Sequence, residues 1–253
     1  MSSTAIPQTV IQVRGLTNRF GDNVVHDNLD LDVYSGEILG VVGGSGSGKS
    51  VLLRSITGLN TPTRGEITIT GKQAGTAGNI GVLFQKGALF SSLTVLENTA
   101  LPLIELAGLS RQQANDIARI KLALTGLPEQ AGALYPSDLS GGMIKRAALA
   151  RSLALEPDVL FLDEPTAGLD PIGAAAFDRL LVTLRDAFAL TVFLITHDLD
   201  TLYAACDRIA VIAQKKVLVV DTLEKVASTP DDWIQEYFHG PRGRAASASN
   251  LQT

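Results

Sequence analysis

The chain has 253 residues, of which 45% are hydrophobic, so it can form one large domain or two small ones around a sizeable core. Its net charge of −5 argues against a broad nucleic-acid-binding face, because such a face needs a basic patch. Cys206 is the only cysteine, which excludes an intrachain disulfide. The first residues lack the basic start and apolar stretch of a signal peptide, and no run of 18 apolar residues occurs, so we expect neither a signal peptide nor a membrane span.

The first third of the chain is predicted to form strands around a single helix. Residues 10–35 alternate polar and apolar side chains, which is typical of antiparallel strands. Residues 38–42 are continuously apolar and suit a buried strand, whereas residues 51–59 carry apolar side chains at helical spacing. Further strands are predicted at residues 65–71, which lie between glycines, and at residues 80–84.

The segment between the 38–42 strand and the helix is rich in glycine and serine and fits the phosphate-loop pattern G-x-x-x-x-G-K-[ST]. Glycines let backbone N–H groups point at phosphate oxygens, and the helix start adds partial positive charge there. Lys49 is expected to reach the β- and γ-phosphates, and Ser50 to hold Mg²⁺ through its hydroxyl. The alternative is a Gly/Ser-rich turn, and the missing G-x-G-x-x-G spacing argues against a dinucleotide. The expected phosphate contacts are Gly43, Gly44, Ser45, Gly46, Ser47, Gly48, Lys49, Ser50 and Val51.

Residues 95 to about 155 have a helical pattern that is interrupted at residues 108, 126 and 136. Ser140-Gly141-Gly142 precedes the last helix of this region, and two glycines and a serine at a helix start form a second anion site. The alternative is a helix that is simply capped by Ser140. Because one nucleotide needs only one such site, two sites predict a dimer in which each nucleotide lies between the phosphate loop of one subunit and the Ser-Gly-Gly of the other.

Two further apolar runs, residues 159–162 and 191–195, suit a parallel sheet that is covered on both faces. The helical stretch 180–188 between them completes a βαβ unit. The first run ends in Asp163 and Glu164, and ligands bind at the carboxyl ends of parallel strands. We therefore expect Asp163 to hold Mg²⁺ and Glu164 to take a proton from an attacking water; an acidic turn is the alternative.

Taken in order, these motifs resemble those of ATP-binding cassette (ABC) ATPases. The matching set is the phosphate loop, Gln85, L-S-G-G at 139–142, D-E at 163–164, A-G-L-D at 167–170 and T-H-D at 196–198, within residues 10 to about 225. The resemblance implies an α/β P-loop NTPase fold with a mixed core sheet, an antiparallel β subdomain and a helical subdomain. It divides the chain into a RecA-like core with the β subdomain (1–85 and 156–230), a helical signature subdomain (86–155) and a C-terminal extension (231–253) whose end is expected to be disordered.

The resemblance also implies roles for single residues, with ATP and Mg²⁺ as cofactors. Phe20 is similar to the aromatic that stacks on adenine, with a core aromatic as the alternative. Gln85 matches the glutamine that touches Mg²⁺ and senses the transporter, and His197 matches the histidine that contacts the γ-phosphate and positions the water, with a structural cap as the alternative. The expected catalytic residues are Glu164, His197 and Gln85, and the expected metal ligands are Ser50, Gln85 and Asp163. The expected γ-phosphate contacts across the dimer are Ser140, Gly141 and Gly142, and Asp170 is expected to organise the subunit junction. His26 and His239 receive no role, and the filled hydrolytic positions argue against an inactive scaffold.

Met143 stands where most of the family has the glutamine of L-S-G-G-Q. Together with residues 84–90 and 146–151 it resembles the ATPases of MCE-type lipid transporters (the Mla group), bacterial complexes that move phospholipids between the inner and outer membranes. This implies a homodimer on the cytoplasmic face of the inner membrane, bound to a permease, with an MCE-domain protein, a small accessory subunit and no nucleic acid. Residues 233–241 resemble that group's C-terminal extension, which either reaches a neighbouring subunit or packs on its own domain.

Three alternatives remain open at this point. The chain could be the ATPase of an amino-acid importer or of a lipoprotein-release system, because the core motifs barely discriminate among them. A soluble ABC protein acting on nucleic acid or ribosomes is disfavoured, since such chains usually carry a coiled-coil insertion or a second cassette.

Overall fold

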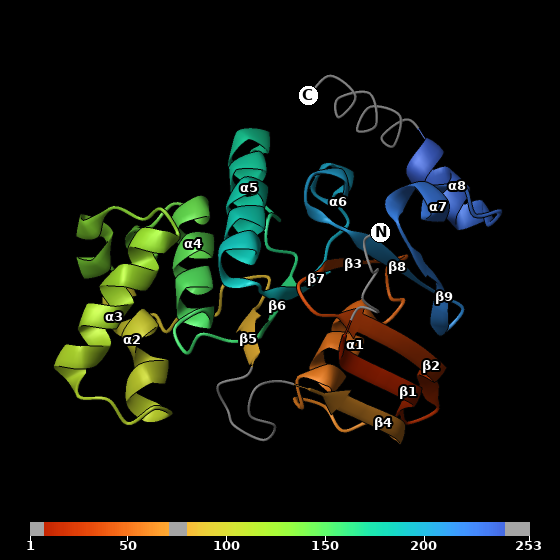
Figure 1. Ribbon diagram of the computed structural model, residues 1–253, viewed down its shortest axis with the longest axis horizontal. Helices are drawn as coiled ribbons and strands as arrows, with labels where there is room; N and C mark the ends of the chain where they lie inside the picture. Colours follow the sequence, from red (N-terminus) through yellow and green to blue (C-terminus); the bar gives the residue numbers. More distant parts are fainter. Residues whose placement is uncertain (1–7, 71–79, 241–253) are drawn as a thin grey trace, which may run out of the picture.

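The computed structural model describes residues 8–70 and 80–240, which form two sheets and a set of helices (Figure 1). The strands are β1 Thr9–Phe20, β2 Asn23–Tyr34, β3 Ile38–Val42, β4 Arg64–Ile69, β5 Ile80–Leu83, β6 Val159–Asp163, β7 Thr191–Ile195, β8 Arg208–Ala213 and β9 Lys216–Asp221. The helices are α1 Lys49–Ile56, α2 Val95–Glu105, α3 Arg111–Leu124, α4 Gly141–Ser152, α5 Pro171–Phe188, α6 Leu199–Ala205, α7 Leu223–Ala227 and α8 Asp232–His239, with the short 3-10 helices η1 Glu129–Ala133 and η2 Pro136–Asp138. The end that was expected to be disordered, residues 245–253, lies outside the described residues.

The larger sheet has the strand order β5-β6-β7-β3-β8-β9. Its strands pair in parallel except for β9, which is antiparallel to β8, so the predicted mixed core sheet is confirmed. The predicted βαβ unit is confirmed as well, since β6 and β7 pair in parallel and α5 connects them. The loops that follow β3, β6 and β7 therefore meet at one edge of the sheet, where ligands bind in open α/β folds.

The smaller sheet is antiparallel, with the order β2-β1-β4, and confirms the alternation of residues 10–35. Helix α1 lies between the two sheets (Figure 1). Leu52 and Leu53 of α1 share one buried cluster with Leu16 of β1 and with Phe161 and Phe193 of the core sheet. The helix that follows the phosphate loop is thus fixed on both sides by apolar packing, which holds the loop at the sheet edge.

Helices α2, α3 and α4 form a lobe that lies away from the antiparallel sheet in Figure 1. The lobe contains apolar clusters of its own, built from residues such as Val95, Leu103, Leu122 and Ala147. The predicted interruptions are confirmed: glycines 108 and 126 have φ angles of 66° and 72° beyond the ends of α2 and α3, where a side chain would be strained. Among the described residues, no helix combines the length and the apolar character that crossing a membrane requires.

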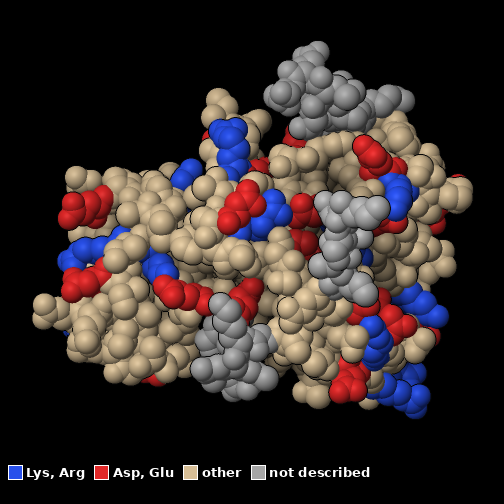
Figure 2. Space-filling view, viewed as in Figure 1, with Lys and Arg blue, Asp and Glu red and all other residues tan. Residues whose placement is uncertain are grey.

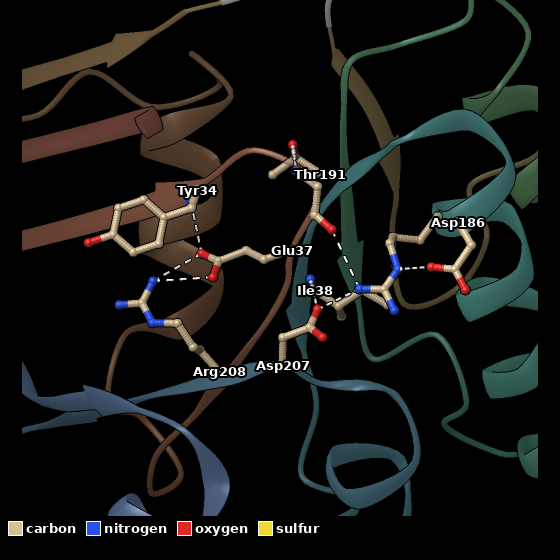
Figure 3. Close-up of polar contacts among 9 residues, drawn as sticks. Tyr34, Glu37, Ile38, Asp186, Thr191, Asp207 and Arg208 are labelled. Atoms are coloured by element: carbon tan, nitrogen blue, oxygen red, sulfur yellow. Dashed lines mark hydrogen bonds and ion pairs between the residues drawn. The ribbon is translucent and has the colours of Figure 1, made fainter. Parts of the chain in front are cut away.

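The amino end of the core sheet is joined by a network of ion pairs (Figure 3). Glu37 accepts hydrogen bonds from the backbone N–H of Tyr34 (2.8 Å) and from the guanidinium of Arg208 (3.1 and 3.2 Å), which also lies 4.5 Å from the centre of the Tyr34 ring. Asp207 accepts from the N–H of Ile38 (2.8 Å) and from Arg185 of α5 (2.6 Å). The network connects β2, β3, β8 and α5 at the edge opposite the phosphate loop.

Three elements have no counterpart in the sequence prediction, namely α6, β8 and β9. The helix predicted at residues 180–188 begins nine residues earlier, because Asp170 caps it by accepting from the N–H of Gly173 (2.9 Å) and Pro171 occupies its first position. The strand predicted at residues 65–71 is β4, whose last described neighbour is Thr70.

Candidate functional site

The phosphate loop curls between β3 and α1, as its sequence predicts. Gly46 and Gly48 have φ angles of 77° and 98°, which a residue with a side chain rarely adopts. Lys49 folds back over the loop and donates hydrogen bonds to the carbonyls of Gly43 (2.7 Å) and Gly44 (3.2 Å). Burial lowers the pKa of the Lys49 ammonium, and the carboxylates of Glu164 and Asp163 act against that shift. The loop is thus a preformed concave backbone with a cation above it.

Ser50 and Asp163 are 113 residues apart in the sequence and meet at the sheet edge. The Ser50 hydroxyl donates to Oδ1 of Asp163 at 3.4 Å. Burial raises the pKa of Asp163, while the Ser50 hydrogen bond and nearby cations lower it. Within the described ranges no group of three His, Cys, Asp or Glu side chains could hold a metal by itself. Two hard oxygen ligands beside a phosphate loop fit Mg²⁺, which takes one or two protein ligands and completes its shell with phosphate and water.

Glu164 and His197 lie within hydrogen-bonding distance of each other next to Asp163, with Nδ1 of His197 2.7 Å from Oε2 of Glu164. The Glu164 carboxylate is 14% exposed and the His197 ring is 71% exposed, so the ring is open to a ligand while the carboxylate lies deeper. The Glu164 backbone has a φ of 51° and donates its N–H to the carbonyl of Ile195 at the end of β7 (2.9 Å). The two residues predicted to handle the attacking water therefore lie in direct contact.

Gln85 follows β5 at the same edge, with an exposed side chain. Its backbone carbonyl accepts a short hydrogen bond from Nζ of Lys145, a lysine of α4 that is only 5% exposed. The same Nζ donates to the backbone carbonyl of Glu164 at 3.0 Å. The motif pattern does not predict this contact; the only signal is helical spacing, which puts Lys145 on the inward face of α4 with Leu149 and Ser152.

The other predicted residues lie apart from this cluster. Phe20 ends β1 and is 50% exposed, so it is not a core aromatic. Ser140 caps α4 by accepting from the N–H of Met143 (3.3 Å), and Gly141 and Gly142 form the first turn of that helix. Nothing in the described residues links Ser140 to the phosphate loop of the same chain by a side-chain hydrogen bond. Asp170 caps α5, as described above.

Two residues without a predicted role lie against the phosphate loop. His26 of β2 is fully buried, accepts from Asn18 through Nδ1 (3.0 Å), and lies so close to Gly48 that a β-carbon there would overlap Nε2. Trp233 of α8 lies beside Gly44, and its ring stacks on Tyr237 at 4.8 Å. Ile234 and Phe238 bury α8 against the core sheet, so the helix packs on its own domain, one of the two outcomes left open for this segment.

A surface cavity of about 730 Å³ lies elsewhere, in the helical lobe. It is lined by residues of α2, α3 and η1 in the helical lobe, with Leu96, Ile120 and Leu127 among its apolar walls and Glu97 and Arg111 at its polar ones. None of the described residues at the carboxyl edge of the core sheet lines this cavity. We place the candidate site at the sheet edge, where the cation, the carboxylates and the loop converge.

Comparison with known proteins agrees with this geometry. The ABC transporter family matches residues 26–167. The chain is 38% identical over 242 residues to the intermembrane phospholipid transport system ATP-binding protein MlaF of Haemophilus influenzae, covering 92% of this chain and 91% of the relative. It is 34% identical to the probable ribonucleotide transport ATP-binding protein mkl of Mycobacterium leprae, covering 92% and 69%.

Solved structures show the same fold. The dimeric ATP-binding cassette MJ0796 in a post-hydrolysis state bound to ADP and Pi matches with a TM-score of 0.74 and 30% identity, over 84% of this chain and 98% of that one. The cbiO1 protein of Clostridium perfringens, part of an ABC transporter complex, matches with a TM-score of 0.77 and 27% identity, over 96% and 99%. With motifs, fold and relatives in agreement, this chain belongs to the ABC transporter family and is one of its ATP-binding, ATP-hydrolysing subunits.

Proposed function

We propose that this chain is the ATPase of an intermembrane phospholipid transporter and works as a homodimer that drives a separate permease. The observation that supports the phospholipid assignment is the 38% identity to the MlaF protein along nearly the whole of both chains. The site supports the ATPase part, because Ser50, Asp163, Glu164 and His197 converge at the carboxyl edge of the sheet beside Lys49.

The residues of one subunit divide the work of hydrolysis. The N–H groups of residues 43–51 and the Lys49 ammonium bind the β- and γ-phosphates. Mg²⁺, held by Ser50, Asp163 and Gln85, would supply charge neutralisation of the phosphates when bound. Glu164 takes a proton from the attacking water, and His197 orients Glu164 and reaches the γ-phosphate with its exposed ring. Phe20, at the exposed end of β1, stacks on the adenine.

The second subunit completes each site. Ser140, Gly141 and Gly142 lie at the start of α4, where backbone N–H groups and the helix dipole favour an anion. In the proposed dimer they contact the γ-phosphate held by the partner, and Asp170 organises the junction between the subunits. Because each ATP touches both chains, ATP binding stabilises the closed dimer, and hydrolysis removes that stabilisation.

The assembly around the dimer is part of the same proposal. The core and β subdomain (1–85 and 156–230) bind nucleotide, the helical subdomain (86–155) carries the signature residues, and residues 231–253 form the extension. The permease docks where the segment after Gln85 joins the helical lobe, on the cytoplasmic face of a bacterial inner membrane. An MCE-domain protein and a small accessory subunit complete the complex. Acidic and basic side chains are interspersed over the face in Figure 2.

Copurification tests the transport assignment. The tagged chain is expressed from its native locus, and its copurifying permease is identified by mass spectrometry. The permease complex is then reconstituted into proteoliposomes with labelled phospholipid. We expect ATP-dependent phospholipid transfer to acceptor vesicles, abolished by Lys49→Ala. Transfer of a ribonucleotide, an amino acid or a lipoprotein instead, with phospholipid inert, would reject the phospholipid assignment and leave the ATPase intact.

A further inference from the structure

Lys145 is a buried cation that donates hydrogen bonds to two backbone carbonyls. It is 5% exposed, and Nζ donates to the carbonyl of Gln85 and to the carbonyl of Glu164. Burial lowers the pKa of this ammonium, and the negative charges of Glu164 and Asp163 act against the shift. A lysine buried this deeply is rare unless its charge is paired or hydrogen-bonded.

The two carbonyls belong to segments that the proposed mechanism uses. Gln85 carries a proposed Mg²⁺ ligand, and Glu164 is the proposed base. Glu164 has a φ of 51°, a left-handed conformation that costs energy for a residue with a side chain and persists only where its surroundings enforce it. Its N–H is held by Ile195, and its carbonyl accepts from Lys145 and from the N–H of Ala167 (3.2 Å).

Lys145 reaches these segments from another part of the molecule. It lies one turn into α4, the helix whose first residues, Gly141 and Gly142, are proposed to contact the partner's ATP. The same helix therefore meets the partner's nucleotide at its start and its own subunit's catalytic segment through Lys145. Among the described contacts, the ammonium is the side chain that hydrogen-bonds both segments at once.

We infer that Lys145 is a positioning residue for ATP hydrolysis. From α4 it holds the backbone of Glu164 and Gln85 in place. The position of the Glu164 carboxylate in one site therefore depends on how the start of α4 binds the ATP of the other site. The inference rests on the proposed roles of Glu164 and the Ser-Gly-Gly segment. Lys145 touches neither ATP nor water in this scheme; it acts through Glu164.

The test compares two variants. Lys145→Met keeps most of the side-chain volume but has no hydrogen-bond donor, whereas Lys145→Arg keeps the positive charge and can donate to both carbonyls. For Lys145→Met we expect a drop in kcat of at least tenfold with KM and ATP affinity changed less than threefold. Lys145→Arg is expected to recover most of the lost kcat. Lys121→Met is the matched control, since Lys121 is also a buried lysine of the helical lobe but pairs with the exposed Glu156 (2.9 Å); its kcat should not change.

A double-mutant cycle separates positioning from general damage. In a Glu164→Gln background, single-turnover hydrolysis should be no slower after Lys145→Met is added, because the carboxylate that Lys145 positions is already gone. Unaltered kcat in Lys145→Met, or an equal loss in both backgrounds, would overturn the inference. If Glu164→Gln itself hydrolyses ATP at the wild-type rate, the proposed base is wrong instead. Should Lys145→Met fail to fold, Lys145→Gln, which donates without charge, takes its place in the same cycle.

Discussion

Glu164 occupies a backbone conformation that its side chain disfavours. A φ of 51° in a residue other than glycine costs about 1–2 kcal/mol. The N–H bonded to Ile195 and the carbonyl bonded to Ala167 show that the conformation is enforced from the neighbouring strand and from the turn that follows. In this conformation Oε2 of the carboxylate lies 2.7 Å from Nδ1 of His197. Strain at this one residue fits a group that must be held in a single orientation for chemistry.

The first prediction concerns that carboxylate. Glu164→Gln keeps the shape of the side chain and removes the proposed base, so we expect steady-state ATPase activity to fall by about 10²–10⁴-fold, the usual contribution of a general base. ATP binding should persist, and closed dimers should accumulate in size-exclusion chromatography with ATP. Glu156→Gln, at an acidic residue that is 82% exposed and outside the site, is the control and should hydrolyse ATP normally.

The second prediction concerns His26. Burial lowers the pKa of this imidazole to about 4, below its ordinary value of 6.5, so the unfolded chain binds a proton between those pH values that the folded chain does not. Stability must therefore fall as the pH drops through this window, by about 2 kcal/mol between pH 7 and pH 5 for this group alone. Urea unfolding should show that the wild type loses that much more stability than His26→Gln over this range.

Comparison with the variant is necessary because Asp178 acts in the opposite direction. Burial raises the pKa of Asp178 to about 6, so its contribution destabilises the fold as the pH rises from about 4 to 6. The two effects offset each other in the wild type. The difference between wild type and His26→Gln isolates the imidazole, and a pH-independent difference would contradict the prediction.

Sequence motifs predicted the residues that the structure brings together at the sheet edge but not the residues that pack behind them. Ser50, Asp163, Glu164 and His197 come together because strand-end residues of a parallel sheet share an edge. His26 was missed because Leu29, Leu31 and Val33 set an alternation that points residue 26 outward. The register shifts near Asn28, whose φ is 55°, and this irregularity turns the imidazole toward Gly48.

At the scale of elements, the β8–β9 hairpin shows why a clear strand pair can escape prediction. Its turn is Gln214-Lys215, and both residues have positive φ values, 50° and 66°. Such two-residue turns usually contain Asn-Gly, Asp-Gly or Gly-Gly, and that signal is absent here. By contrast, the helical pattern of residues 95–155 predicted α2 and α3, and the structure adds complete capping boxes at Thr94 and Ser110, where these helices begin.

The third prediction tests the element network at the amino end of the core sheet (Figure 3). Arg208→Met leaves Glu37, which is 8% exposed and whose pKa burial already raises, without its cation. Breaking a buried pair in this way should lower the free energy of unfolding by about 3 kcal/mol. Arg119→Met is the control, because Arg119 and its partner Asp116 are 55% and 64% exposed and such surface pairs contribute about 0–1 kcal/mol. Denaturant unfolding at neutral pH measures both, and equal losses would contradict the prediction.

At the scale of the whole molecule, the two phosphate-type sites of one chain are separate. The phosphate loop follows β3 at the carboxyl edge of the core sheet and leads into α1, whereas Ser140 begins α4 in the helical lobe (Figure 1). Sequence alone predicted this pair of half-sites, because both are local loop-to-helix motifs. Their relation across a dimer is a property of the assembly rather than of one chain.

Mixing two defective chains tests the composite site. Lys49→Ala removes the phosphate loop's cation, and Ser140→Phe blocks the start of α4, at a capping cost of about 1 kcal/mol that melting curves can monitor. Both are made in the Glu164→Gln background, where trapped radiolabelled ATP counts intact sites without turnover. Each chain alone should trap none, since every homodimer site contains one defect.

In a mixed dimer the two defects fall into one site and leave the other intact. An equal mixture should therefore trap ATP at about a quarter of the sites counted for Glu164→Gln alone, because about half of the dimers are mixed and each has one good site of two. If instead each chain held ATP with its own Ser140, every site in the mixture would keep its defect. Trapping would then stay at the background level, and the sandwiched arrangement would be wrong.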